Sequence, residues 1–234
     1  VKAESAHVRQ RVALCVSGKI TLDDIHRGDT LVDPSAVGLS ERIDVSVRLL
    51  PNVSRPVKHL SPVKLHIGAK RVAAKLALIN HSDTRLSAGS ETMAQLILDE
   101  PLCTTRGERF VIRDDSETHT LGGGFVLDPS GPKYGKAKPD RLVWLDALRK
   151  DPLEVAVPSL IEMDQCVDFE RLAACFNHKQ PSPSSFTPDD CLKFQSGGKP
   201  WIVRKTMLAE ARTLLLSMVK EQLSKEQREN GGSA

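Results

Sequence analysis

The chain has 234 residues, enough for one large domain or two smaller ones with proper hydrophobic cores. Its 33 Lys and Arg residues against 30 Asp and Glu residues give a net charge of +3, too small to indicate nucleic-acid binding by itself. Five cysteines without Cys-x-x-Cys spacing argue against a disulfide framework or a four-thiolate zinc site. The sequence shows no signal peptide and no apolar run of membrane-spanning length, which predicts a cytoplasmic protein without membrane contact.

The first half of the chain is typical of an all-β domain, because turn residues recur about every eight to twelve positions. Between them lie short apolar runs, at residues 12–16, 30–32, 43–50, 63–67, 72–79, 94–98 and 110–112. Residues 43–49 alternate between apolar and polar side chains, as expected of a strand with one buried face. Many short strands of this kind predict a mostly antiparallel sandwich or barrel.

Three consecutive glycines, Gly122, Gly123 and Gly124, stand between a charged turn and the apolar run at residues 125–127. The flanking runs suit strands, and the triplet removes every side chain where one strand must bend or admit another backbone. We therefore expect the triplet to lie in a strand and not in a helix or a coil.

Glycine and proline become frequent at residues 131–139, which also carry Lys133, Lys136 and Lys138. This composition predicts a basic linker between two domains. As a nucleotide-binding loop the segment fails, because one residue is missing between its glycines and Ala137 replaces the Ser or Thr that would hold Mg²⁺. We find no other catalytic or metal-binding constellation, so we expect a chain that is not an enzyme and holds no cofactor.

After the linker the hydrophobic period changes from two to about 3.6, which predicts helices at residues 142–150, 151–158 and 168–176. Residues 192–203 predict a β-hairpin around a Ser-Gly-Gly turn. Helices followed by a hairpin are typical of an α+β winged-helix domain. A long amphipathic helix is predicted next, at residues 206–227.

The segment around the glycine triplet resembles a known family. Arg113-Asp114, followed by Thr120-Leu121 and the glycines, is similar to the closing strands of the third β-barrel domain of translation elongation factors, most of all the selenocysteine-specific factor. Residues 9–28 resemble the end of the second barrel domain of tRNA-delivering elongation factors, with an acidic-acidic-Ile-x-Arg-Gly segment at residues 23–28. The chain is thus similar to a fragment of such a factor without its GTPase domain.

The resemblance implies a multidomain fold, in which an all-β translation-factor barrel is followed by an α+β winged-helix domain. Residues 1–38 would be the C-terminal part of the second β-barrel domain, and residues 39–130 the third barrel. Residues 131–139 would be the linker, residues 140–205 the first winged helix, and residues 206–234 the opening helix of a truncated second one.

The resemblance also implies a function. A selenocysteine-specific elongation factor carries selenocysteyl-tRNA to the ribosome and hydrolyses GTP with Mg²⁺, and its last winged helix binds an mRNA hairpin. This chain would supply tRNA-binding surfaces and spacer architecture beside the parent's GTPase domain. We expect it to bind neither GTP nor the mRNA hairpin by itself.

The family's tRNA contacts lie on the rim of the third barrel. By motif position, Arg113 and the acidic Asp114 belong to this rim, and a second rim segment carries cations that would neutralise phosphates. A basic strand edge that only blocks aggregation is the alternative for any single lysine. The expected tRNA-binding residues are Lys70, Arg71, Lys75, Arg113, Asp114 and His119.

The dipeptide Gln10-Arg11 matches one that, in the selenocysteine-specific family, places an arginine in the aminoacyl pocket. A selenol ionises at neutral pH more readily than a hydroxyl or a thiol, so a guanidinium would favour selenocysteine over serine. An ordinary surface arginine is the alternative for Arg11. For Asp24 and Arg27 we expect an ion pair across a tight turn, with Ile25 filling the barrel.

A rival hypothesis of another class is a winged-helix DNA-binding regulator with a β-rich sensor domain. It requires base-reading side chains on the third helix. The residues there, Asp168, Glu170, Arg171 and Asn177, instead give a mixed and partly acidic face. The sequence therefore favours the elongation-factor interpretation.

Overall fold

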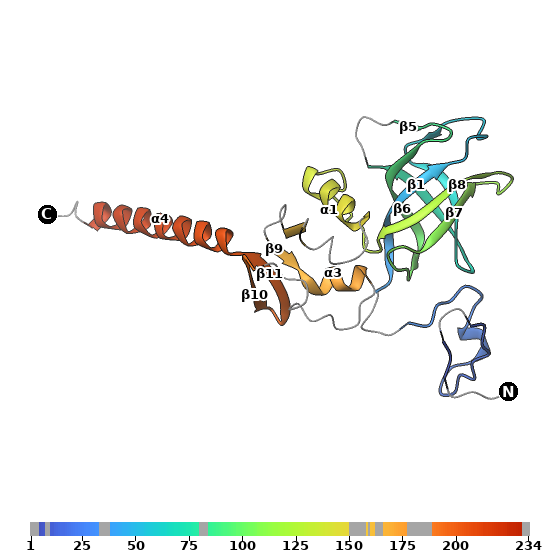
Figure 1. Ribbon diagram of the computed structural model, residues 1–234, viewed down its shortest axis with the longest axis horizontal. Coiled ribbons are helices and arrows are strands. Elements are labelled where there is room, and N and C mark those ends of the chain that lie inside the picture. Colours follow the sequence, from blue (N-terminus) through green and yellow to red (C-terminus); the bar gives the residue numbers. More distant parts are fainter. Residues whose placement is uncertain are drawn as a thin grey trace.

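The computed structural model describes residues 5–7, 10–32, 38–79, 84–149, 158, 160–161, 166–176 and 189–230. For residue 22, residues 173–174 and residues 223–230 it describes the backbone alone. The described residues form a closed barrel, a smaller layer of helices and strands beside it, and one long helix (Figure 1).

Six antiparallel strands close into a barrel in the order β1-β6-β4-β3-β7-β8, which confirms the predicted antiparallel barrel. They are β1 (Ser40–Leu49), β3 (Ser61–Ile67), β4 (Lys70–Leu78), β6 (Glu91–Leu102), β7 (Arg109–Asp114) and β8 (Thr120–Asp128). Two short strands, β2 (Val57–Lys58) and β5 (Arg85–Leu86), pair with each other.

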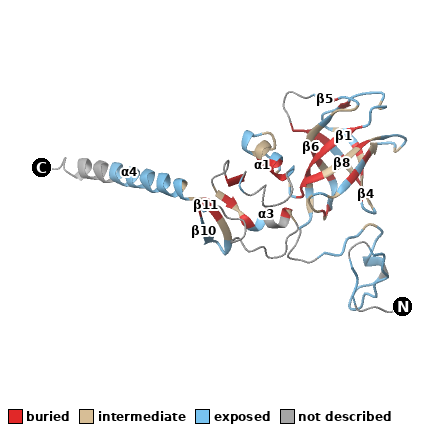
Figure 2. Ribbon diagram, viewed as in Figure 1, coloured by how far each residue is buried: buried red, intermediate tan, exposed pale blue. Residues whose placement is uncertain are grey.

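Alternating side chains from all six strands fill the barrel with one hydrophobic core (Figure 2). Val45, Leu65, Leu96 and Ile112 are completely buried there. Burying an aliphatic side chain of this size contributes about 1.5–3 kcal/mol relative to leaving it exposed. On β1 the outward residue Asp44 is buried as well, because the next layer of the structure covers this part of the barrel.

The glycine triplet lies in β8, as predicted, where β8 pairs with β1 on one side and with β7 on the other. A Cβ on Gly122 would lie 2.2 Å from the Arg48 carbonyl oxygen, and a Cβ on Gly124 would lie 1.8 Å from that of Ser46. On the β7 side, a Cβ on Gly123 would meet a backbone oxygen at 2.5 Å. The barrel therefore closes only because these positions have no side chain.

The smaller layer packs two helices and a three-stranded sheet around a second core. The helices are α1 (Pro139–Arg149) and α3 (Phe169–Cys175), and the strands are β9 (Cys166–Asp168), β10 (Cys191–Ser196) and β11 (Lys199–Arg204), in the order β10-β11-β9. The predicted hairpin is confirmed as β10 and β11, with Gly197 and Gly198 at positive φ in the turn. The strand β9 was not predicted, and the predicted helix at residues 151–158 lies outside the described residues except for Pro158.

The predicted long helix is confirmed as α4 (Lys205–Asn230), which projects away from the smaller layer (Figure 1). Its apolar side chains Leu214, Leu215, Met218 and Val219 are exposed, so no described part of the chain covers the predicted apolar face. None of the described helices combines the length and the apolarity needed to cross a membrane.

The N-terminal segment differs from the prediction. Within residues 10–32 the structure has one short 3-10 helix, η1 (Leu22–Asp24), and no strand, so the strands predicted at residues 12–16 and 30–32 are wrong. A strand needs a neighbour to accept its backbone hydrogen bonds, and no described strand pairs with this segment.

The expected Asp24–Arg27 ion pair is also wrong. The Asp24 carboxylate instead accepts hydrogen bonds from the backbone N and the hydroxyl of Thr21, both at 2.8 Å, and these bonds lower the pKa of Asp24. Ile25 is half exposed and does not fill the barrel.

The predicted linker at residues 131–139 is in part attached to the barrel. Gly131 N donates to the Arg42 carbonyl oxygen at 2.8 Å, and Gln95 Nε2 donates to the Pro132 carbonyl oxygen at 3.0 Å. The linker also ends one residue earlier than predicted, since α1 begins at Pro139, where the missing N–H of proline costs nothing.

Candidate nucleic-acid interface

Basic side chains cover the outer face of three neighbouring barrel strands, β4, β3 and β7. Alternate residues on these strands point into the core, as Val72, Leu65 and Ile112 do, so the residues between them point outward. We call the basic residues among these outward positions the cationic face: Lys64, His66, Arg71, Lys75, Arg109 and Arg113.

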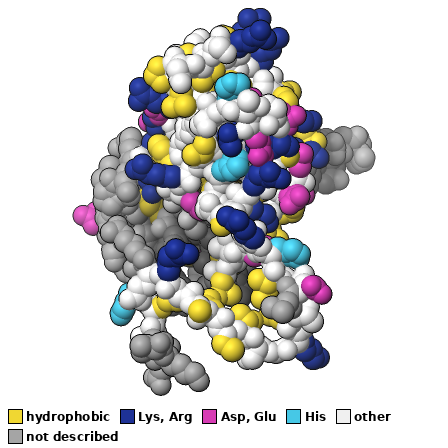
Figure 3. All heavy atoms as spheres, turned by 90° about the vertical axis from the view of Figure 1, so that its right-hand side faces the viewer, with side chains coloured by type: hydrophobic (Ala, Val, Ile, Leu, Met, Phe, Trp, Pro, Cys, Tyr) yellow, Lys and Arg dark blue, Asp and Glu magenta, His cyan; other side chains and the backbone are white. Residues whose placement is uncertain are grey.

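The strand register sets several of these side chains next to one another. His66 on β3 lies opposite Arg71 on β4, and Lys64 on β3 lies opposite Arg113 on β7. Directly opposed residues on one face of a sheet have Cβ atoms about 5 Å apart, so neighbouring cations can meet one stretch of nucleic-acid backbone. Figure 3 shows Lys and Arg side chains spread over one face of the molecule, with Asp and Glu side chains among them.

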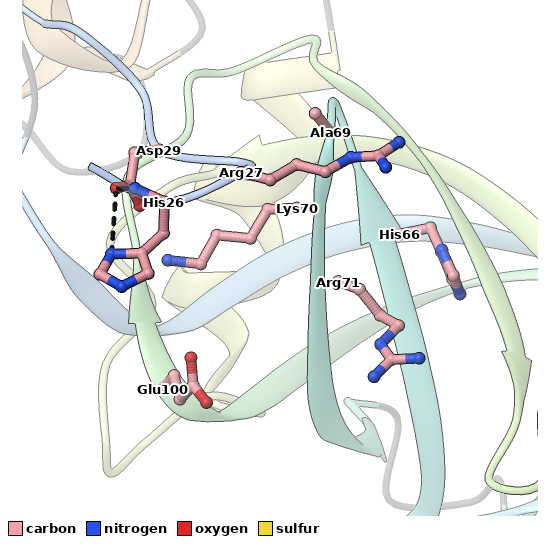
Figure 4. A pocket seen from close by; sticks show the side chains of 8 residues that line it. All are labelled: His26, Arg27, Asp29, His66, Ala69, Lys70, Arg71 and Glu100. Carbon is pink, nitrogen blue, oxygen red and sulfur yellow. Dashed lines mark hydrogen bonds and ion pairs between the residues drawn. The ribbon is translucent and has the colours of Figure 1, made fainter. Parts of the chain in front are cut away.

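A pocket of about 680 Å³ opens beside the cationic face, between the β3–β4 turn and the N-terminal segment (Figure 4). It is lined by His26, Arg27, Asp29, His66, Ala69, Lys70, Arg71 and Glu100. A Cβ on Gly28 would lie 2.8 Å from the Lys70 Cα, so the N-terminal segment packs directly on the β3–β4 turn. Cations outnumber carboxylates in the lining, and in Figure 4 the Lys70 side chain extends toward His26 and Asp29. A phosphate group suits such a lining.

Asp114 organises the turn between β7 and β8. Its Oδ1 accepts a hydrogen bond from the His119 backbone N at 3.0 Å, and its Oδ2 accepts one from the Ser116 hydroxyl at 3.0 Å. The hydrogen bond from the His119 backbone is the main reason that the pKa of Asp114 lies below its ordinary value, although some burial opposes the shift. The His119 ring is 3.3 Å from the same carboxylate and otherwise exposed.

Two acidic residues of this turn reach the cationic face. Glu117 Oε2 lies 3.2 Å from Arg71 NH1, and Asp115 Oδ1 lies 3.3 Å from Lys64 Nζ. The strand order places β3 and β4 beyond β7, so the turn folds back across β7 to make these contacts.

The structure thus brings most of the predicted site residues into two adjoining groups. Lys70 and Arg71 border the pocket, whereas Arg113, Asp114 and His119 lie at the β7–β8 turn, and the Arg71–Glu117 ion pair joins the groups. Lys75 lies farther along β4, opposite Pro62. Arg11 is exposed on the N-terminal segment and does not line the pocket.

Residues 41–133 match the family model described as the beta-barrel domain of the selenocysteine-specific elongation factor. The barrel belongs to that family. This match covers the closed barrel and the cationic face together, and it confirms the resemblance that the Arg-Asp and glycine motifs indicated.

Curated relatives named selenocysteine-specific elongation factor agree with this assignment. The one from Escherichia coli K12 is 29% identical over 147 residues, which are 63% of this chain and 22% of the relative. The one from Desulfomicrobium baculatum is 28% identical over 138 residues, 59% of this chain and 21% of the relative. The chain therefore spans about a fifth of the length of these relatives.

A solved structure has the same fold. The bacterial selenocysteine-specific elongation factor EF-Sec superimposes with a TM-score of 0.59 over 88% of this chain and 31% of that chain, at 15% sequence identity. At this identity the likeness shows the fold of the barrel and not the roles of single residues.

The rival DNA-binding hypothesis gains no support from the third helix. In α3, Phe169, Leu172 and Cys175 are buried. The guanidinium of Arg171 donates to the barrel carboxylate Asp128 at 3.1 Å and lies over the Trp144 ring, so it does not face a DNA groove. The family match of the barrel does not favour a regulator either.

Several residues of the site were not predicted to belong to it, namely Lys64, Arg109, Asp115 and Glu117. Lys64 and His66 alternate with the buried Val63, Leu65 and Ile67, and this alternation was sufficient to predict that they point outward. Nothing local indicated that Asp115 and Glu117 would reach strands on the far side of β7, because that contact depends on the strand order.

Proposed function

We propose that this chain is the tRNA-holding part of a selenocysteine-specific elongation factor, which delivers selenocysteyl-tRNA to the ribosome in a GTP-dependent step. The parent's GTPase domain would bind GTP and Mg²⁺. This chain would contribute a binding surface and spacing between domains, without catalysing a reaction.

One observation carries the proposal: a barrel of this family presents basic side chains from three neighbouring strands on one outer face. A row of cations at strand spacing suits the phosphates of an RNA duplex, which set affinity and register without reading sequence. The pocket at Lys70 and Arg71 extends the same positive surface toward the N-terminal segment.

The proposal includes a division of the chain into domains. Residues 39–130 would be the third barrel, and residues 1–38 the end of the second barrel, where Arg11 would face the selenol. Residues 131–139 would link the barrel to a first winged helix at residues 140–205, which contains α1, α3 and the β9–β11 sheet. Residues 206–234 would open a second winged helix, and contact with the mRNA hairpin would belong to later domains of the parent.

Filter binding with the tRNA that accepts selenocysteine tests the proposal. In the double variant Lys70→Gln/Arg71→Gln, we expect weaker binding and a slope of log K against log salt that is smaller by about 1 for each lost phosphate contact. The matched control is Arg212→Gln/Lys220→Gln on α4, which removes the same charge from an exposed surface far from the cationic face in sequence.

The control double variant should bind tRNA like the unmodified chain. An equal loss in both double variants would show that only net charge matters and would contradict a site at the cationic face. Duplex DNA, offered at the same salt concentrations as tRNA, should bind less tightly than tRNA, and a preference for DNA would support the regulator instead.

A further inference from the structure

The β7–β8 turn, residues Asp114 to His119, places two carboxylates on the basic surface that the proposed function requires. We call this segment the acidic turn. Its residues Glu117 and Asp115 form ion pairs with Arg71 on β4 and Lys64 on β3. The cations that would meet RNA phosphates are therefore already partly neutralised by the chain itself.

The acidic turn is held in this position by its own hydrogen bonds. Besides the bonds that its carboxylate accepts, Asp114 also accepts a backbone hydrogen bond from Glu117 N at 2.9 Å. Glu117 adopts a left-handed backbone conformation, with φ of 57°, which a residue with a side chain rarely takes. These features fix the position of Glu117, whose carboxylate contacts Arg71 on the sheet.

The closed arrangement leaves polar atoms buried without hydrogen-bond partners. They are Glu117 Oε1, Arg113 Nε and His66 Nε2, which lie on the acidic turn and on the cationic face beneath it. A buried polar group without a partner destabilises the arrangement that buries it. Moving Glu117 into water would satisfy its carboxylate, and a phosphate oxygen would give Arg113 the acceptor that it lacks.

We propose that Asp115 and Glu117 are competing anions, which occupy the cationic face until the phosphates of an RNA duplex displace them. The proposal rests on the proposed function, because it assigns the same face to RNA. Displacing the acidic turn reduces the binding free energy of every polyanion by the same amount. Only a partner with further contacts elsewhere offsets this cost, so the acidic turn limits occupancy of the face by arbitrary RNA.

Removing the competing charge should tighten binding. A partly exposed ion pair contributes about 0.2–1 kcal/mol, so Glu117→Gln should bind an RNA duplex about 1.4- to fivefold more tightly than the unmodified chain. Asp115→Asn should act in the same direction. The matched control is Glu210→Gln on α4, which removes the same charge from an exposed position and should leave the affinity unchanged.

A second pair of variants separates competition from a structural role. Glu117→Gly keeps the left-handed conformation, which glycine adopts without strain, and should tighten binding as Glu117→Gln does. In an Arg71→Gln background the gain from Glu117→Gln should disappear, because the cation that it releases is absent. Thermal unfolding by circular dichroism checks that each variant is folded. If Glu117→Gln does not fold, the binding measured for Glu117→Gly tests the proposal instead.

Inorganic polyphosphate serves as a second probe, because it tests the face without assuming an RNA partner. Tighter polyphosphate binding by Glu117→Gln with no RNA binding by any variant would overturn the proposed function and keep the competing-anion role. Unchanged or weaker binding of both probes by both Glu117 variants, relative to the unmodified chain, would overturn the inference itself.

Discussion

Asp128 shows how one residue joins the barrel to the layer beside it. Its carboxylate is completely buried at the end of β8. Oδ2 accepts a hydrogen bond from Trp144 Nε1 at 3.1 Å and lies 2.8 Å from Arg141 NH2, and Oδ1 accepts one from Ser130 N at 2.8 Å. A buried carboxylate is tolerated only when it is paired and hydrogen-bonded in this way.

Arg141 bridges two such carboxylates, because it also binds the buried Asp44 on β1. Burial raises the pKa of Asp44, and the guanidinium of Arg141 opposes that shift. Gln95 Nε2 donates to the other oxygen of Asp44 at 2.8 Å and completes the network. Arg141 therefore pairs with two buried barrel carboxylates at this junction, and Arg171 also contacts one of them, Asp128.

Arg141→Met should destabilise the chain by about 3–5 kcal/mol, because it leaves the buried Asp44 without its cation and Asp128 with Arg171 alone. The unpaired Asp44 would bind a proton more tightly when folded than when unfolded, so the loss should be smaller at mildly acidic than at neutral pH. Urea unfolding monitored by tryptophan fluorescence measures both effects.

Arg149→Met is the matched control, since Arg149 pairs with Glu91 in an ion pair whose two side chains are about 40% exposed. It should cost less than about 1 kcal/mol. If both variants unfold at the same urea concentration, the buried network does not stabilise the junction.

Strand β8 is the element on which the closure of the barrel depends. It pairs with β1 and β7 at once, and its glycines face backbone oxygens of both neighbours. Two adjacent strands can approach a third this closely only where no Cβ intervenes.

Gly124→Ala should therefore destabilise the barrel, because its Cβ would overlap a backbone oxygen that cannot rotate away. We expect the free energy of unfolding to fall by an amount at the upper end of about 1–3 kcal/mol. The melting temperature and denaturant unfolding measure this change. Gly38→Ala is the matched control, since a Cβ there would meet nothing within 4 Å. A barrel that melts alike in both variants would show that closure does not need the glycine.

Barrel residues contribute to the second core, that of the smaller layer, and so join the two parts of the molecule. Ile79 and Leu127 from the barrel pack with Leu145, Leu148 and Leu172 from the helices. At the edge of this core, the guanidinium of the barrel residue Arg106 donates to a backbone oxygen at the end of α1 at 2.6 Å. The two parts should move as one body in solution.

Cys175 lies in this core, so chemical labelling of its thiol shows whether the core has opened. Burial raises the pKa of Cys175, and the nearby Asp128 carboxylate raises it further, so little reactive thiolate forms. In the native chain we expect iodoacetamide to label the exposed Cys15 promptly and Cys175 only on unfolding, as read by peptide mass spectrometry. Arg141→Met should speed Cys175 labelling and Arg149→Met should not. Prompt labelling of Cys175 in the unmodified chain would contradict a closed junction.

Much of the fold was predictable because its signals are local. Strand alternation, the glycine triplet, the hairpin turn at residues 196–198 and the long helix depend on neighbouring residues, and the structure confirms each of them. Strand β9 was missed because it has three residues, and its pairing with β11 joins segments distant in sequence. The strand expected at residues 12–16 is absent for the opposite reason. Its local sequence pattern suits a strand, but no described strand pairs with it.

The candidate site divides in the same way. The barrel, its family motif and the basic residues Lys70, Arg71 and Arg113 were predictable, because periodicity and motif spacing are properties of contiguous segments. The pairing of Glu117 with Arg71, 46 positions away, and of Arg141 with Asp44, 97 positions away, was visible only in the folded chain. Such pairs depend on strand order and on the closure of the barrel, which bring together charges that no local pattern relates.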